Sequence, residues 1–150
     1  MGDSAGGGLS LGFAIYLKEL SLPQPKEIVL FSPWVDIATD NPEIALVEPF
    51  DPFLKQSGIQ EVAKFWAGEE LKQPLVSPLF GDLSGLGRIS IYIGTHDIFY
   101  PDNRLLHEKL LKEGITHRYI EREKMNHVYV LFPIKEARED IQELIEELKK

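Results

Sequence analysis

The chain has 150 residues, of which 43% are hydrophobic and 27% are charged, and its formal net charge is −8. This length and balance fit one globular domain over residues 1–150. The lack of cysteine excludes a disulfide framework, a Cys-based zinc site and a cysteine nucleophile. The 24 acidic residues outnumber the 16 basic ones, which disfavours nucleic acid or an anionic membrane surface as partner. With no signal peptide and no apolar run near the roughly 18 residues of a membrane span, we expect a soluble, cytoplasmic protein.

The first predicted elements are a helix and a buried strand. Residues 9–20 carry an apolar stripe at helical spacing. The stripe is formed by Leu9, Gly12, Phe13, Tyr16, Leu17 and Leu20. The helix is expected to end before the proline-containing segment 21–25. Residues 27–33 then form a short apolar run, which is typical of a strand buried on both faces of a parallel sheet.

A proline-rich insertion occupies about residues 34–80. Ile59, Val62, Ala63 and Trp66 mark one short helix within it, and we expect the rest to be loop or cap. Its aromatic side chains have two interpretations: ordinary core packing, which is the commoner one, or the wall of an acyl or alcohol pocket. These residues are Trp34, Phe50, Phe53, Phe65 and Trp66.

The remaining chain alternates strands and helices. A second buried strand is predicted at residues 88–94, and residues 116–122 are a third strand candidate. Asp102 is a candidate N-cap for the helix between them, and Gly114 is its candidate stop. A last helix begins near Lys135, with one apolar face. That face contains Ala137, Ile141, Leu144, Ile145 and Leu148. The alternation predicts an α/β fold in three αβα layers, with about three parallel strands.

The segment Gly2-Asp3-Ser4-Ala5-Gly6 matches G-x-S-x-G at the start of a helix, which is the nucleophile-elbow pattern. The residues that flank the serine need to be small. The serine is strained on a sharp turn, and Cβ atoms on the flanking residues would clash with the adjacent strand and helix. The turn also brings the hydroxyl to a helix N-terminus, where the backbone N–H of Ala5 is a candidate oxyanion donor. A glycine-rich phosphate loop or a flexible terminus is the alternative, although neither a Rossmann fingerprint nor a P-loop ending is present.

A serine nucleophile needs a base and an acid that orients it, and on this kind of fold the acid precedes the histidine. Asp97 follows the second strand and His127 follows the third, so both are expected at the carboxyl edge of the sheet. Asp102 competes for the role of acid, but Asp97 lies nearer the strand end and is favoured. The other histidines are interpreted as loop or surface residues. They are His96, His107 and His117.

Four motifs follow one another along the chain. They are Gly2–Gly7, Ser77–Leu86, Gly94–Asp97 with Asp102, and Asn126-His127. Together they resemble the hormone-sensitive-lipase-like branch of the α/β-hydrolases, which contains bacterial carboxylesterases and acetyl esterases. The resemblance implies a serine carboxylesterase for short acyl esters, with no cofactor and no metal. It makes Ser4 the nucleophile, Asp97 the acid and His127 the base, and gives Ser77–Leu86 a structural role ahead of the penultimate strand.

Members of this branch also have a long N-terminal half with a cap, further strands and a His-Gly-Gly-Gly motif that completes the oxyanion hole. This chain has no such motif, and only Met1-Gly2-Asp3 precede Ser4. We therefore expect the C-terminal portion of a catalytic domain, starting at the elbow with essentially no strand before Ser4. Loss of one oxyanion donor costs on the order of 10²–10³ in turnover, so activity of this chain alone is a separate question.

The same resemblance leaves the predicted strand at 27–32 without its neighbour. An apolar exposed edge invites pairing with another chain. Besides a small-molecule ester, the expected partner is therefore a second copy of the chain or a complementary N-terminal half. The alternative function is a non-catalytic remnant that only associates in this way.

Overall fold

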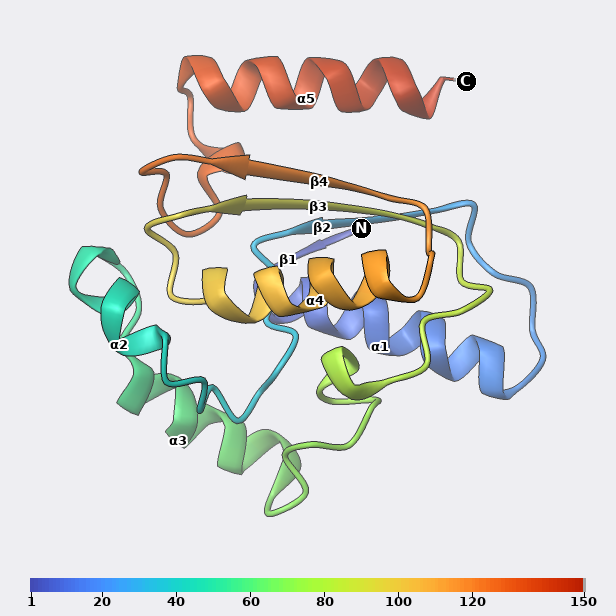
Figure 1. Ribbon diagram of the computed structural model, residues 1–150, viewed down its shortest axis with the longest axis horizontal. Helices are drawn as coiled ribbons and strands as arrows, with labels where there is room; N and C mark the ends of the chain where they lie inside the picture. Colours follow the sequence, from blue (N-terminus) through green and yellow to red (C-terminus); the bar gives the residue numbers. More distant parts are fainter. Residues whose placement is uncertain (150) are drawn as a thin grey trace.

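The computed structural model describes residues 1–149, which form a parallel β-sheet with helices on both faces (Figure 1). The strands of this part of the chain are β1 (Gly2–Asp3), β2 (Glu27–Phe31), β3 (Arg88–Gly94) and β4 (His117–Arg122), in that spatial order. Each neighbouring pair is parallel. The α/β fold class is confirmed, with four strands where about three were expected.

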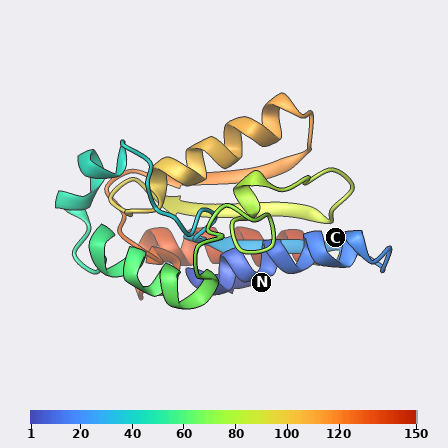
Figure 2. The same ribbon diagram turned by 90° about the horizontal axis from the view of Figure 1, so that it is seen from below.

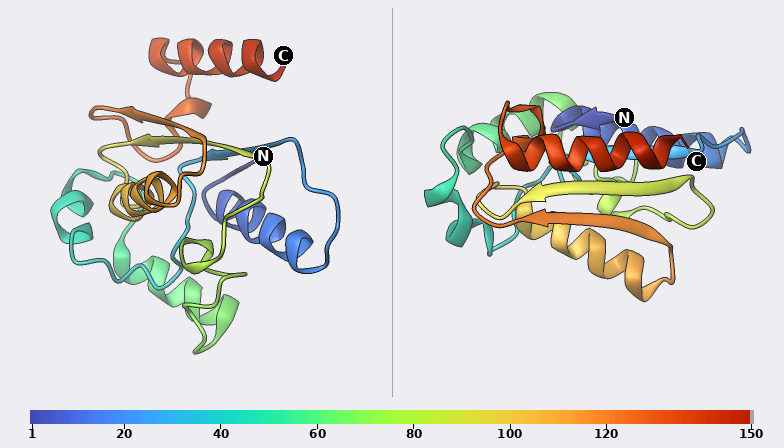
Figure 3. Two further views of the ribbon diagram at one scale, coloured as in Figure 1. Left: turned by 45° about the vertical axis from the view of Figure 1, so that its right-hand side comes forward. Right: turned by 90° about the horizontal axis from the view of Figure 1, so that it is seen from above.

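Helices form the two outer layers, so the three-layer arrangement is also confirmed. α5 (Lys135–Leu148) covers one face, and Figure 3 shows it running lengthwise over the sheet. α1 (Ala5–Glu19) and α4 (Tyr100–Lys112) cover the other face. Shorter elements are α2 (Ile44–Val47), α3 (Gln56–Ala67) and 3-10 helices at Glu48–Phe50, Pro78–Phe80 and Tyr129–Leu131. No helix in residues 1–149 is both long and apolar enough to cross a membrane.

Side chains of β2 and β3 alternate between two hydrophobic clusters, because successive residues of a strand point to opposite faces. The cluster under α1 and α4 includes Leu11, Ala14, Ile15, Ile28, Leu30, Ile89, Ile91, Leu106 and Leu110. The cluster under α5 includes Val29, Phe31, Tyr92, Tyr129, Val130, Ala137 and Leu144. Burial of both faces explains why these strands are continuous apolar runs in the sequence.

The helix that follows Ser4 forms as predicted but turns a different side to the core. Its buried residues are Gly7, Gly8, Leu11, Gly12, Ala14 and Ile15. Of the predicted stripe, Gly12 is buried as expected and Leu17 is half-buried, whereas the large side chains Leu9 and Phe13 are 55% and 56% exposed. The reason is close packing at glycine: a Cβ on Gly8 would lie 2.0 Å from the carbonyl oxygen of Trp34. Side chains larger than hydrogen are excluded at Gly8, so α1 buries the side that carries its close-packed glycines together with Leu11 and Ile15.

A short strand does precede Ser4, which corrects the expectation of none. Gly2 pairs with Leu30 and Asp3 with Phe31. β1 therefore covers only the carboxyl end of β2. The first three residues of β2, Glu27–Val29, pair with β3 alone among the described strands, so this part of the edge is open to backbone pairing.

The helices in the C-terminal half begin where the sequence indicates, with one correction. α4 begins at Tyr100, so Asp102 lies in its first turn and is not its N-cap. Gly114 follows the C-cap with φ 67°, as expected for a helix stop. α5 begins at Lys135 and buries Ala137 and Leu144 of its predicted face.

The insertion after β2 forms a third cluster at the end of the sheet to which the strands point (Figures 1 and 2). It includes Trp34, Ile37, Ile44, Ile59, Ala63, Ile98 and Phe99. The predicted helix around Ile59 is α3. Because Ile98 and Phe99 follow Asp97 directly, the insertion shares its core with the loop after β3.

Gly8→Ala is expected to lower the free energy of unfolding by about 1–3 kcal/mol, because its Cβ meets the Trp34 carbonyl. Gly6→Ala is the matched control in the same helix, since a Cβ on Gly6 has no neighbour within 4 Å. Alanine there should be neutral or stabilising by roughly 0.5–1 kcal/mol. Urea unfolding followed by circular dichroism measures both variants, and equal midpoints would contradict the packing argument.

Candidate active site

Ser4 lies on the turn between β1 and α1 in a strained conformation, with φ 52° and ψ −123°. Its backbone is held on both sides: Ser4 N donates to Phe31 O at 2.9 Å, and Trp34 N donates to Ser4 O at 2.9 Å. The amides of Gly7 and Gly8 donate to the same carbonyl. Strain of this kind persists only where the surroundings enforce it. The turn places the Ser4 hydroxyl at the carboxyl edge of the sheet and the N-terminus of α1.

Only one of the two flanking glycines is sterically required by the described residues. A Cβ on Gly2 would lie 2.2 Å from the carbonyl oxygen of Gly6. A Cβ on Gly6 would meet nothing within 4 Å. The expected clash at both positions is therefore wrong for Gly6.

His127 reaches Ser4 across the end of the sheet. It follows β4, is 6% exposed, and its Nε2 lies 3.0 Å from Ser4 Oγ. Its Nδ1 lies 3.0 Å from Asp97 Oδ2. With the proton on Nδ1, the imidazole donates to Asp97 and its Nε2 accepts from the Ser4 hydroxyl. One ring therefore connects a hydroxyl to a carboxylate.

Asp97 is fully buried in the turn after β3. Its second carboxylate oxygen, Oδ1, accepts from the backbone N–H of Phe99 at 2.9 Å. The Phe99 ring in turn contacts His127 edge-on, with centroids 5.3 Å apart. The carboxylate and the imidazole are thus held by neighbours as well as by each other. The structure brings together the three side chains that the sequence singled out, Ser4, Asp97 and His127.

Comparison with known proteins adds the family. A family described as having the alpha/beta hydrolase fold matches residues 1–131. The chain belongs to this family.

Relatives of this α/β-hydrolase include enzymes and solved structures. It is 32% identical over 129 residues to an acetyl-hydrolase of Streptomyces hygroscopicus, covering 85% of this chain and 43% of the relative. It is 31% identical over 121 residues to a triacylglycerol lipase of Mycobacterium tuberculosis, covering 80% of this chain and 23% of that one. A crystal structure of a hormone-sensitive lipase from a metagenome library superposes with a TM-score of 0.91 at 29% identity, covering 99% of this chain and 52% of the other.

These matches confirm the resemblance to the hormone-sensitive-lipase-like branch of the α/β-hydrolases. The chain spans about half the length of the solved structure, and less than half of the two curated relatives.

The other candidates lie elsewhere in this α/β-hydrolase. Asp102 contacts Asn41, whose side-chain amide donates to Asp102 Oδ1 at 2.9 Å. His96 lies in the turn after β3 and stacks on Phe50. The two remaining histidines pair with each other, with His107 Nδ1 2.7 Å from His117 Nε2. Both of these rings are half-buried, where surface positions were expected. Burial and the neighbouring imidazole lower the pKa of His107.

The Ser77–Leu86 segment carries structural contacts. Ser77 Oγ accepts from Ile37 N at 2.9 Å and donates to Leu71 O, which ties the segment to the insertion. Asp82 forms an ion pair with Lys18 of α1 at 2.6 Å. The segment thus fastens α1 and the insertion ahead of β3, in agreement with its expected role. Across residues 1–149, no cluster of three His, Cys, Asp or Glu side chains is placed to hold a metal ion.

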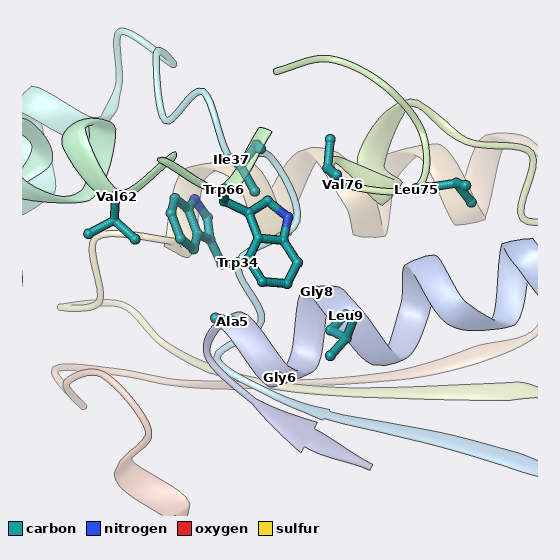
Figure 4. Close-up of a pocket in the computed structure, with 10 residues that line it drawn as sticks. All are labelled: Ala5, Gly6, Gly8, Leu9, Trp34, Ile37, Val62, Trp66, Leu75 and Val76. Atoms are coloured by element: carbon teal, nitrogen blue, oxygen red, sulfur yellow. The ribbon is translucent and has the colours of Figure 1, made fainter. Parts of the chain in front are cut away.

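A cavity of about 190 Å³ lies between the start of α1 and α3 (Figure 4). It is lined by Ala5, Gly6, Gly8, Leu9, Trp34, Ile37, Val62, Trp66, Leu75 and Val76. The lining is mainly apolar. Because Ala5 follows Ser4 directly, the cavity lies next to the turn that carries Ser4. The sequence did not single out Val62 or Leu75 as pocket residues, since an apolar residue has the same appearance in a core.

The aromatic residues of the insertion divide between the two interpretations. Core packing holds for Trp34, which is 8% exposed and stacks on Phe99. It is wrong for the other four, all more than half exposed: Phe50, Phe53, Phe65 and Trp66. Trp34 and Trp66 both line the cavity, in agreement with the pocket-wall interpretation.

Asp102 is expected to make stability fall as the pH rises. Burial raises its pKa from 3.8 to about 6, and its Oδ2 has no hydrogen-bond partner among residues 1–149. The folded state binds this proton more tightly than the unfolded state. Protonated Asp102 therefore contributes its full stabilisation of the folded state below about pH 4, and this stabilisation is lost by about pH 6. Asp102→Asn removes this titration. Relative to wild type, the free energy of unfolding of the variant should therefore increase by up to about 3 kcal/mol between about pH 4 and pH 7.

Urea unfolding at a series of pH values measures this gain. Asp82→Asn is the control of opposite sign, because hydrogen bonds from Lys18 and Ser84 lower the pKa of Asp82. Its wild-type contribution is present at neutral pH and is lost as the pH falls. Parallel curves for Asp102→Asn and wild type would refute the assignment.

Proposed function

We propose that the chain carries the catalytic triad of a serine carboxylic-ester hydrolase for short acyl esters. Ser4 is the nucleophile, His127 the general base and Asp97 the acid that orients it. The observation that carries the proposal is the continuous contact Ser4 Oγ, His127 Nε2, His127 Nδ1, Asp97 Oδ2, with both separations 3.0 Å. Membership in the family and the printed activities of the relatives support it.

The first half of the reaction forms an acyl-serine. His127 Nε2 takes the proton of Ser4 Oγ as this oxygen attacks the ester carbonyl carbon, and the carbonyl electron pair moves to oxygen. The backbone N–H of Ala5, in the first turn of α1, donates to that oxyanion, and the helix N-terminus adds a favourable field. When the intermediate collapses, the C–O bond to the alcohol breaks. The leaving oxygen takes the proton from His127.

Water completes the cycle by the same route in reverse. His127 removes a proton from water as it attacks the acyl carbon, and Ser4 Oγ leaves with the proton that the imidazole returns. Asp97 stabilises the imidazolium in both halves. Its buried position and the N–H of Phe99 keep the carboxylate oriented for this task.

The cavity beside Ala5 supports a small apolar group on the substrate. Its volume of about 190 Å³ and its lining by Trp34 and Trp66 suit a short acyl chain or a small alcohol. A long acyl chain would extend beyond it. The proposed substrate class is therefore a short-chain ester.

Hydrolysis of a chromogenic acetyl or butyryl ester tests the assignment of the nucleophile. Ser4→Ala should reduce turnover to the rate of a preparation without enzyme, because no other group replaces the attacking oxygen. His127→Gln is expected to do the same. Equal rates for wild type and Ser4→Ala would sink the proposal.

A paired substitution separates the two carboxylates. Asp97→Asn should lower kcat by about 10⁴-fold, because an amide cannot stabilise the imidazolium and favours the wrong tautomer. Asp102→Asn should leave kcat close to that of wild type, since Asp102 contacts Asn41 and not His127. Loss of activity in Asp102→Asn with activity retained in Asp97→Asn would reverse the assignment.

A second candidate function is association, which two observations favour. Part of β2 is an open edge, and the outer side of α1 presents a half-exposed apolar stripe with Leu9, Phe13, Tyr16 and Leu20. The chain also spans about half the length of a solved relative. We propose that a segment equivalent to the remaining half of the relatives packs on this face, with residues 1–150 as the C-terminal portion of the catalytic domain. That segment would supply the oxyanion donors beyond Ala5.

Light scattering at micromolar concentration tests the association. The chain alone should form a dimer or larger species through its apolar face, or a 1:1 complex with the complementary half of a relative. Phe13→Glu should weaken both, because it places a charge in the stripe. Leu111→Glu is the control, as Leu111 is 61% exposed on α4, away from β1. A monomer that binds no such half would contradict the proposal.

A further inference from the structure

Residues Phe31–Trp34, here called the β2 exit segment, lie where β2 leaves the sheet and are all buried. They contact the turn that carries Ser4 from both sides. Phe31 O accepts from Ser4 N, and Trp34 N donates to Ser4 O, each at 2.9 Å. The strained backbone of the proposed nucleophile is thus clamped between the two ends of this segment.

The side chain of Ser32 connects the same segment to the loop of the proposed base. Ser32 Oγ accepts from the backbone N–H of Val128 at 2.9 Å, across 96 positions of sequence. Val128 follows His127 and has φ 51° and ψ 35°. A β-branched residue is an outlier in this left-handed region and stays there only when it is held. The Ser32 hydroxyl is the side-chain group that holds it.

Pro33 connects the segment to the loop of the proposed acid. Its carbonyl oxygen accepts from Asn103 Nδ2 at 2.9 Å, and the same amide donates to Phe99 O at 2.9 Å. Phe99 also donates its N–H to Asp97 Oδ1. Asn103 is fully buried on α4. One amide group therefore joins the exit segment to the turn that presents Asp97.

We propose that Ser32 and Asn103 are positioning residues that hold the three triad loops in one geometry through the β2 exit segment. The proposal rests on the proposed function for the meaning of the geometry. The loops leave different strands, and catalytic groups work only within about 0.5 Å of their productive positions. Ser32 is itself fixed, because its N–H donates to Tyr92 O at 2.8 Å. Neither side chain touches the reacting atoms.

Three variants of the full chain test this. Ser32→Ala removes the acceptor for Val128. Ser32→Gly removes the same acceptor and also relieves the backbone, because Ser32 has φ 46°, so it keeps the test valid if the alanine variant folds poorly. Asn103→Leu removes the amide at similar volume. Ser90→Ala is the matched control, since Ser90 is a buried serine near the start of β3.

Two readouts report on geometry and a third on folding. Proton NMR follows the His127 Nδ1 proton shared with Asp97. Labelling with a fluorophosphonate ester gives the rate of modification of Ser4, and thermal unfolding gives the midpoint. The three variants should lose or shift the NMR signal and label about 10- to 100-fold more slowly, whereas Ser90→Ala should change only the midpoint.

The outcomes separate the two levels of inference. If both Ser32 variants and Asn103→Leu keep the signal and the labelling rate of Ser90→Ala, the positioning role is overturned. If Ser32→Ala loses the NMR signal and the labelling rate but Ser32→Gly keeps both, backbone strain is the cause and the role of the hydroxyl is overturned. If wild-type Ser4 is not labelled at all, the proposed function fails, and the NMR signal alone still decides whether Ser32 and Asn103 hold the imidazole.

Discussion

Ser4 keeps a backbone conformation that a residue with a side chain adopts only under constraint, with φ 52° and ψ −123°. The constraint is a pair of main-chain hydrogen bonds to Phe31 and Trp34, completed by the close packing of α1 against the chain that leaves β2. Everything else at this edge depends on it. The direction of the Ser4 hydroxyl, the start of α1 and the position of the Ala5 amide all follow from one turn held in place.

The sequence predicted the parts of the site that follow from strand order. Asp97 follows the buried strand β3 and His127 follows the half-buried strand β4. Parallel strands end at the same edge, so the convergence of both residues with Ser4 follows from topology. The same reasoning could not find β1, because two residues carry no periodicity. It also could not find the contact between Ser32 and Val128, since nothing local marks a hydrogen bond between residues 96 positions apart.

The orientation of α1 shows where a hydrophobic pattern is insufficient. The largest apolar side chains form a regular stripe, but Gly8 and Gly12 allow the helix to approach Trp34 and Leu75 at main-chain distance. Close approach outweighs side-chain size there. The insertion shows the opposite case. Its aromatic residues are of a type usual in cores, but some are exposed, such as Phe65 at 93%. In both cases the neighbours decide, and they lie far away in the sequence.

The insertion and the loop of Asp97 are mechanically one unit. Asp51 is buried and uses one carboxylate oxygen for the amides of Phe53 and Leu54 and the other for the amide of Ile98. Asp51 thereby joins the insertion to the residue after Asp97. The cavity wall, which includes Trp66 of α3, and the carboxylate share this support. Asp51 therefore adds a hydrogen-bonded connection to the hydrophobic cluster that the insertion already shares with the loop of Asp97.

The order of strands in the sheet, which repeats their order in the chain, also bears on how the molecule assembles. Pairing β3 with β4 closes a connection of 22 residues, whereas pairing β2 with β3 closes one of 56. Longer closures cost more chain entropy and slow the formation of non-local contacts. A chain that folds in order of closure cost joins Asp97 to His127 within an early β3-α4-β4 unit. It acquires Ser4 only when the longer connection closes, so the hydroxyl enters a carboxylate–imidazole pair that already exists.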